Sequence, residues 1–338
     1  MSLFHLAARA IQAGLLAASV AVAASATLKP SAQQPTKDPL TQANELLQAG
    51  EADKALSLLQ SQPASAQAHN LTCRVRFTLE QWDAAIKECE QAVHLDGQNA
   101  SYHLWLGRAL GEKADRASFL SAFSLAKRVR EEFEQAVHLD PRNAAALSDL
   151  GEFYYDAPGV VGGGMDKAES IAAQLDKIDP ARAHELRGRM ALARKDYGTA
   201  EQEFKQAIAV GAHPAYQWVT LASFYRQRQR WSDMESAVHN AVSSAERDKH
   251  AGVALYDGAS VLTKANRDPT LAVKMLDDYL AGSSKSEQAP AFVAYVRLAR
   301  LDAQLGDAAG AQRERAAAIA MAHEYRPAQD PGAQETKH

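Results

Sequence analysis

Features that would mark a nucleic-acid-binding or a metal-binding protein are missing from this sequence. Aromatic residues make up 7% of the 338 residues, the net charge is -4, and no run of five or six like charges occurs. Nucleic acid is therefore not expected as a partner, because its phosphates require a basic patch. The 11 histidines are scattered without a His-Glu-x-x-His motif, so we expect neither a metal site nor another cofactor.

Cysteine is also scarce, since Cys73 and Cys89 are the only two. An oxidising compartment would allow them to form a disulfide. Two separately buried thiols fit the sequence equally well, because free cysteine is among the most buried residue types. The sequence leaves both alternatives open.

Residues 1–26 differ in composition from the rest of the chain. A positive charge precedes an almost wholly apolar run over residues 11–22, and small residues close the segment. This pattern predicts a signal peptide cut after Ala26, or after Ala23, and then a flexible leader over residues 27–38. The apolar run is short for a membrane span, so we expect export to the periplasm or the medium without stable membrane insertion.

A repeated segment organises the remaining chain. Residues 90–100 return as residues 134–144, with nine of the eleven positions identical. Self-similarity at a fixed spacing is typical of repeat proteins. Long stretches consist of Ala, Leu, Gln, Glu and Arg, which favour helices.

The repeated unit resembles the tetratricopeptide repeat, a helix–turn–helix of about 34 residues. Its marker residues are clearest in one copy, which contains Trp218, Leu221, Ala222, Tyr225, Trp231 and Ala241. The resemblance implies an all-α fold, an α-solenoid of about eight helix–turn–helix units that forms a superhelix over residues 39–323. In such a unit, small residues such as Gly107, Gly151 and Gly188 let two helices approach, and bulky residues such as Phe133 and Phe204 fill the space beside them.

Two units are longer than the others. The excess near residues 111–128 contains few helix breakers and is expected to lengthen the helices. The excess near residues 156–165 contains Pro158 and three consecutive glycines, which predict a loop. Beyond the last unit, we expect a flexible tail over residues 324–338.

The resemblance places ligands on the concave surface lined by the first helices of the units. The position after the small residue should point there, and Arg occupies four of the eight such positions: Asn44, Arg74, Arg108, Glu152, Arg189, Ser223, Ala259 and Arg300. Our candidate groove residues are Asn70, Arg74, Phe77, Trp105, Arg108, Glu152, Tyr155, Arg189 and Arg226. A row of arginines suits a peptide or protein partner that carries carboxylates. Arginine is equally a common solvated helix residue, and that alternative stays open.

These features predict a non-catalytic scaffold or adaptor that binds a peptide or protein partner in its concave groove. One alternative is an accessory or self-associating subunit of a cell-envelope complex that docks through residues 111–164. A remote alternative is a hydrolase, because Ser124 and Lys127 match the Ser-x-x-Lys of penicillin-recognising enzymes. That chemistry also requires Ser-Asp-Asn and Lys-Thr-Gly motifs, and the sequence contains neither, so we expect no catalysis.

Overall fold

The computed structural model describes residues 37–330 and Gly332. The predicted signal peptide and all but the last two residues of the predicted leader lie outside the described residues. The described residues form one compact unit.

Residues 37–330 contain 17 α-helices, one short 3-10 turn and no named β-strand. The helices are α1 (Pro39–Ala49), α2 (Ala52–Gln60), α3 (Ala66–Thr78), α4 (Trp82–Leu95), α5 (Ala100–Ala114), α6 (Phe119–Leu139), α7 (Ala144–Asp156), α8 (Met165–Leu175), α9 (Pro180–Ala193), α10 (Tyr197–Val210), α11 (Pro214–Gln227), α12 (Trp231–Ala245), α13 (Gly252–Ala265), α14 (Pro269–Ala281), α15 (Ala291–Leu305), α16 (Ala308–Met321) and α17 (Arg326–Gln329), with the 3-10 turn η1 (Gly159–Val161) between α7 and α8.

Local sequence signals define where these helices begin and end. The side chain of Ser65 accepts a hydrogen bond from a backbone N–H in the first turn of α3, and Asn143 does the same for α7. Such caps satisfy N–H groups that have no partner inside the helix. At the other end, α1 and α15 stop at Gly50 and Gly306, whose φ angles of 80° and 90° are left-handed.

Small residues bring the two helices of a pair into contact, as the sequence predicted. A Cβ atom on Gly107 would lie 2.5 Å from Cε1 of Phe133, and one on Gly188 would lie 2.6 Å from Cε1 of Phe204. No side chain fits between these helices at such positions. The prediction of an all-α array of about eight helix–turn–helix units is confirmed, because α1 to α16 form eight successive pairs.

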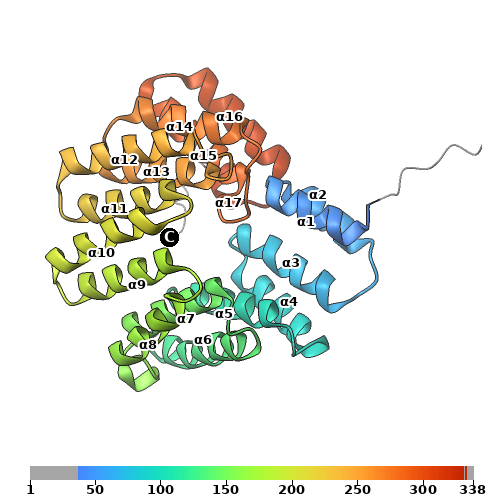
Figure 1. The fold of residues 1–338 in the computed structure, drawn as a ribbon. Helices are drawn as coiled ribbons and strands as arrows, with labels where there is room; N and C mark the ends of the chain where they lie inside the picture. Colours follow the sequence, from blue (N-terminus) through green and yellow to red (C-terminus); the bar gives the residue numbers. More distant parts are fainter. Residues whose placement is uncertain (1–36, 331, 333–338) are drawn as a thin grey trace, which may run out of the picture. The chain divides into compact units, whose positions relative to one another are not determined.

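The eight pairs follow one another around a central space, and the last pair lies beside the first (Figure 1). Gln48 of α1 donates a hydrogen bond to Glu287, which precedes α15, over 3.0 Å. The backbone N–H of His323, just after α16, donates to Asp53 of α2 over 2.9 Å. The array of residues 37–330 is therefore closed from its first pair to its last, which the repeat pattern did not predict.

The start of the predicted C-terminal tail needs a correction. Residues 324–330 pack onto the array, and Tyr325 is fully buried with its ring 4.9 Å from the ring of Phe292. Glu324 accepts a hydrogen bond from Arg76 over 2.7 Å. These contacts join α17 to both ends of the array, so this segment is part of the fold. No helix in the described part of the chain is both long and apolar enough to cross a membrane.

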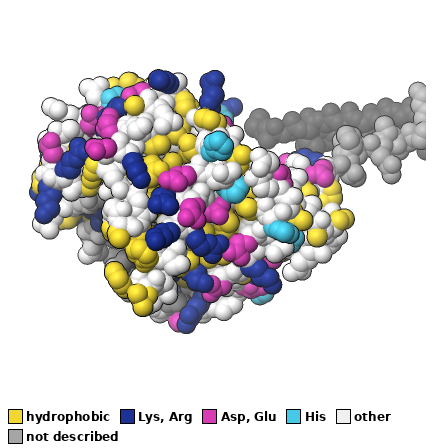
Figure 2. Space-filling view, turned by 90° about the horizontal axis from the view of Figure 1, so that it is seen from below, with side chains coloured by type: hydrophobic (Ala, Val, Ile, Leu, Met, Phe, Trp, Pro, Cys, Tyr) yellow, Lys and Arg dark blue, Asp and Glu magenta, His cyan; other side chains and the backbone are white. Residues whose placement is uncertain are grey.

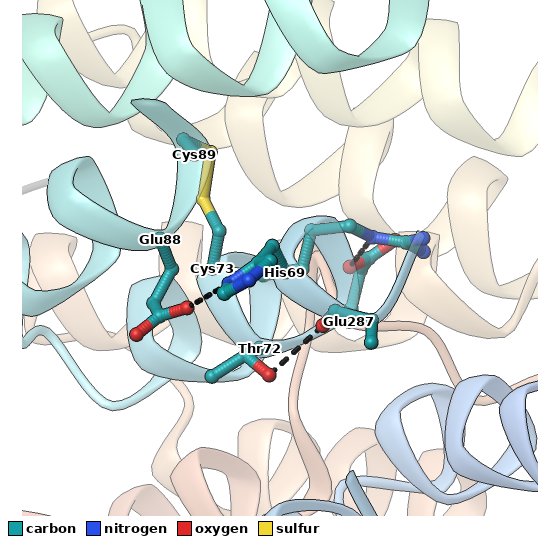
Figure 3. Close-up of a disulfide and its surroundings, with 8 residues drawn as sticks. His69, Thr72, Cys73, Glu88, Cys89 and Glu287 are labelled. Carbon is teal, nitrogen blue, oxygen red and sulfur yellow. Dashed lines mark hydrogen bonds and ion pairs between the residues drawn. A yellow bond between two sulfur atoms is a disulfide. The ribbon is translucent and has the colours of Figure 1, made fainter. Parts of the chain in front are cut away.

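Cys73 of α3 and Cys89 of α4 form a disulfide, which resolves the alternative that the sequence left open (Figure 3). Both cysteines are fully buried. The longer units lie one and two pairs further along the chain. Residues 111–128 comprise the end of α5, a turn and the first half of α6, which has 21 residues, and residues 156–165 connect α7 to α8 through η1.

Candidate functional site

The first helices of the pairs line two adjoining cavities at the centre of the array. The larger has a volume of about 1320 Å³ and lies mainly between α7, α9, α11 and α13. The smaller has a volume of about 290 Å³ and lies between α3, α5, α13 and α15. Gln288 and Arg297 line both cavities. Six of the nine candidate residues line these cavities: Phe77, Trp105, Arg108, Tyr155, Arg189 and Arg226.

The candidates Phe77, Trp105 and Arg108 line the smaller cavity, and Arg74 lies behind them against Trp105 without lining either cavity. The guanidinium carbons of Arg74 and Arg108 lie 5.4 and 4.8 Å from the ring centroid of Trp105. The ring of Phe77 contacts Trp105 edge-on. Asn70 is instead buried within the helix packing, and its Nδ2 has no hydrogen-bond partner among the described residues. The candidates Phe77, Arg74 and Arg108 thus form an aromatic and basic cluster around Trp105. The candidate Asn70 does not belong to it and lines neither cavity.

Arg74 and Arg108 already bind carboxylates of this chain. Arg74 donates from Nε and Nη2 to the two carboxylate oxygens of Glu287 over 2.9 and 2.6 Å. Arg108 donates from Nε to Asp149 over 2.6 Å. Paired, charge-assisted hydrogen bonds of this kind are among the strongest in proteins. Neither guanidinium therefore lies open to a ligand in this structure.

The candidates Tyr155 and Arg189 line the larger cavity, and both bind Glu152, which lines neither cavity. Arg189 and the Tyr155 hydroxyl donate to the same Glu152 oxygen over 3.5 and 3.4 Å. Burial, reinforced by the charge of Glu152, raises the pKa of Tyr155 to about 12, so its hydroxyl remains a hydrogen-bond donor. Arg189 is thus the third of the predicted groove arginines, after Arg74 and Arg108, that pairs with a carboxylate of this chain.

Helix α11 brings unsatisfied polar atoms to the larger cavity. Both Arg226 Nε and Gln217 Oε1 are buried and have no hydrogen-bond partner among the described residues, and both residues line this cavity. The other amide atom of Gln217 donates to Glu185 over 3.0 Å. Burial raises the pKa of Glu185, and it raises the pKa of Asp257 on the facing helix α13 to about 6. The wall of the larger cavity is thus polar and incompletely paired.

Not all of the eight residues that follow a small residue in the first helices line a cavity. Ser223 lines the larger cavity, but Ala259 is buried and lines neither. In the last pair Arg297 lines both cavities, and Arg300 lines neither. Tyr256 of α13 also lines both cavities, and it lies three residues before Ala259, as Arg297 lies three residues before Arg300.

Glu185, Gln217, Asp257 and Glu287 were not among the residues predicted from the sequence. The first three lie on first helices, within one turn or two of the predicted position, so the helical period could have indicated them. Glu287 belongs to the connection between α14 and α15, where no repeat pattern applies. No sequence signal pointed to it.

Histidines pair with carboxylates within the helix pairs. Each of three histidines lies four residues before the small position of its first helix and binds a Glu of the second helix through Nδ1: His69 with Glu88, His103 with Glu132, and His184 with Glu203, over 2.6–2.7 Å. The hydrogen bond with Glu132 raises the pKa of His103. No group of three metal-ligating side chains occurs in the described part of the chain. These histidines join helices.

The inserted residues give the outer surface its most exposed apolar side chains. Phe119 and Leu120 at the start of α6 are 85% and 82% exposed, and Val160 in η1 is 72% exposed. Elsewhere on α6, the amino group of Lys127 lies over the ring of Phe123, and no hydrogen bond joins it to Ser124 in the described structure. On the face shown in Figure 2, basic, acidic and histidine side chains are interspersed, without separation by sign.

Comparisons with known proteins add the following similarities. The family model described as "Regulator of microtubule dynamics protein 1-3" matches residues 39–159, a little over a third of the chain. No curated protein matches the chain. A solved thermophilic tetratricopeptide-repeat protein of Thermus thermophilus is 18% identical, covers 55% of this chain and 96% of its own, and has a TM-score of 0.47.

Two further solved structures are similar at lower scores. The C-terminal part of a tetratricopeptide-repeat-containing protein of Cytophaga hutchinsonii is 14% identical, covers 87% of this chain and all of its own, and has a TM-score of 0.40. PilF of Pseudomonas aeruginosa is also 14% identical, covers 78% of this chain and 96% of its own, and has a TM-score of 0.37. With its eight helix pairs and their small-residue contacts, the chain described here is a tetratricopeptide-like repeat protein.

Proposed function

We propose that this protein is a non-catalytic scaffold that binds an extended segment of a partner protein in the larger central cavity. Five first helices contribute to that cavity, and its volume of about 1320 Å³ exceeds the ~300–1,000 Å³ of most small-molecule sites. A peptide of several residues suits such a space better than a metabolite does.

The unpaired polar atoms of α11 carry this proposal. Leaving a buried donor or acceptor without a partner costs roughly 1–3 kcal/mol, so Arg226 Nε and Gln217 Oε1 both favour a ligand that supplies the missing bond. A peptide backbone offers a C=O acceptor to the first and an N–H donor to the second.

An acidic partner remains part of the proposal in a restricted form. Arg74, Arg108 and Arg189 are paired with Glu287, Asp149 and Glu152 respectively. A partner carboxylate would have to replace one of these internal carboxylates. Arg226 differs from these three arginines, because its buried Nε has no hydrogen-bond partner among the described residues. It could therefore bind an acceptor of the partner without displacing a carboxylate of this chain.

Affinity capture from an envelope extract tests cavity binding. The exported chain, its Arg226→Glu variant and an Arg194→Glu variant would each be used as bait. Arg194 provides the matched control, because it is exposed at the end of α9 and lines neither cavity. We expect the native protein and Arg194→Glu to retain a common partner and Arg226→Glu to lose it. Equal retention by all three baits would reject the cavity as the binding site.

We also propose that the protein is exported. The composition of residues 1–26 supports a signal peptide, and a disulfide between Cys73 and Cys89 suits an oxidising compartment. N-terminal sequencing of the protein recovered from fractionated cells should begin at Thr27 or Ala24. An intact N-terminus on protein found in the cytosol would contradict export.

A second candidate function is docking to a fixed complex through the insertion at residues 111–164. The exposed side chains of the adjacent residues Phe119 and Leu120 favour it, because neighbouring exposed apolar residues mark interaction sites. In the same capture experiment, a Phe119→Ser/Leu120→Ser bait should then lose the partner while Arg226→Glu retains it. The opposite pattern would favour the cavity.

A further inference from the structure

The connection between α14 and α15 places a carboxylate in a site built by other parts of the array. The carboxylate of Glu287 accepts hydrogen bonds from Arg74 Nε and Nη2 and from Gln48 Nε2, over 2.6–3.0 Å. The backbone N–H of Glu287 also donates to Gln48 Oε1 over 3.2 Å. Both Glu287 oxygens and its N–H are therefore bound by side chains of α1 and α3.

Arg74 has contacts that hold its guanidinium in place independently of Glu287. Arg74 Nη2 also donates to Asn44 Oδ1 of α1 over 3.0 Å, and the guanidinium lies against the Trp105 ring of α5. The Arg74 side chain is only 16% exposed. A largely buried guanidinium without a carboxylate is costly, so this preorganised site favours binding of another carboxylate if Glu287 leaves.

The rest of the connection is anchored outside this site. Tyr279 of α14 donates through its hydroxyl to the carbonyl of Ala289, and Ser284 bonds to the carbonyl of Lys249. Gln288, next to Glu287, lines both cavities. Withdrawal of Glu287 and Gln288, two of the four residues between these anchors, would therefore open a path from the larger cavity to Arg74.

We propose that Glu287 is an internal ligand, and that an acidic side chain of the partner segment replaces it at Arg74, Asn44 and Gln48. This inference rests on the proposed function and adds a specificity: the segment that fills the larger cavity carries a Glu or Asp toward the smaller one. Glu287 then acts as a tethered competitor that limits binding of segments without an acidic residue at that place.

The inference can be tested without the partner, with the chain's own connection as the probe. The probe is a synthetic peptide with the sequence of residues 283–290, Ser-Ser-Lys-Ser-Glu-Gln-Ala-Pro, and its control has Gln in place of Glu. Binding would be followed by NMR of the Arg Nε–H and Trp indole signals at millimolar peptide, the range of effective concentration for a short tether. The proteins are the native chain, Glu287→Gln, Glu80→Gln and Glu287→Gln/Arg74→Gln.

The matched control is Glu80→Gln, which removes a carboxylate from the same cavity without touching Arg74. We expect the Glu peptide to bind Glu287→Gln on the order of tenfold more tightly than it binds the native chain or Glu80→Gln. A tenfold ratio corresponds to about 1.4 kcal/mol, which is the competition by Glu287 that the variant removes. The Gln peptide should not bind, and Arg74→Gln should abolish binding. Equal affinities, no binding at millimolar peptide, or binding that survives Arg74→Gln would overturn the inference.

A second measurement covers the case in which Glu287→Gln does not fold. In the native chain, excess Glu peptide should accelerate hydrogen exchange of the Glu287 amide, which is bonded to Gln48, and the Gln peptide should not. Unchanged exchange would overturn the inference. Failure here would leave the Arg226→Glu capture result standing, because that experiment addresses the larger cavity and this one addresses Arg74.

Discussion

Removing the disulfide should loosen one helix pair strongly and distant pairs very little. Cys73 and Cys89 are 16 residues apart in the sequence and join α3 to α4. In the chain-entropy model, closing a loop of about 15 residues stabilises the folded state by about 3 kcal/mol. The stability of a repeat array is roughly a sum of unit and neighbour contributions, so this loss should appear mainly in the α3–α4 pair.

Native-state hydrogen exchange measures this loss helix by helix. In a Cys73→Ala/Cys89→Ala variant, amides of α3 and α4 should exchange on the order of a hundredfold faster, because each 1.4 kcal/mol is worth about tenfold. The amides of α11 and α12 serve as the internal control. The His323 amide should also exchange faster, since Arg76 of α3 binds the neighbouring Glu324 where the array closes. Unchanged exchange in α3 and α4, or a uniform increase that includes α11 and α12, would refute the reasoning.

Two further predictions concern helix packing and pH. Gly107→Ala should destabilise the fold by about 1–3 kcal/mol, because the new Cβ would lie 2.5 Å from Phe133. A Cβ atom on Gly111 in the same helix would meet nothing within 4 Å, so Gly111→Ala should stabilise the helix by up to about 1 kcal/mol. Urea unfolding of both variants checks this, and equal shifts of their midpoints would contradict the packing at Gly107. The pKa of His103 is raised above its ordinary 6.5 by Glu132, so that bond stabilises the fold fully below the ordinary value and is lost as the pH rises through the raised one. Glu132→Gln should therefore lower the unfolding free energy more at about pH 5 than at about pH 8, and a loss that grows with pH would disprove it.

Features that depend on short stretches of sequence could be predicted. Gly107 and Phe133 belong to one helix pair, as do Gly188 and Phe204, so their contacts follow from spacing within a unit. The same holds for the aromatic and basic cluster at Trp105, which neighbouring first helices assemble. In each case the repeat fixes which residues face one another before any long-range contact is known.

Features that depend on closure of the array could not be predicted. Arg74 and Glu287 are 213 residues apart, and the repeat pattern gives no information about a pair between the two ends of a solenoid. A second long-range contact lies at the last unit, where a Cβ atom on Gly50, which follows α1, would lie 2.6 Å from the backbone N of Ala291 in α15. The spacing within one repeat carries no information about this contact either.

The central claim is that a partner segment lies inside the array, and site-specific photocrosslinking tests it most directly. A photoreactive amino acid would replace Ser223, which lines the larger cavity, and in a separate protein Leu120, at the exposed tip of the insertion. Both proteins would be irradiated in intact cells and their crosslinked products compared. The account predicts a discrete crosslinked partner from position 223 that is lost with Arg226→Glu. A partner crosslinked from position 120 alone would contradict it.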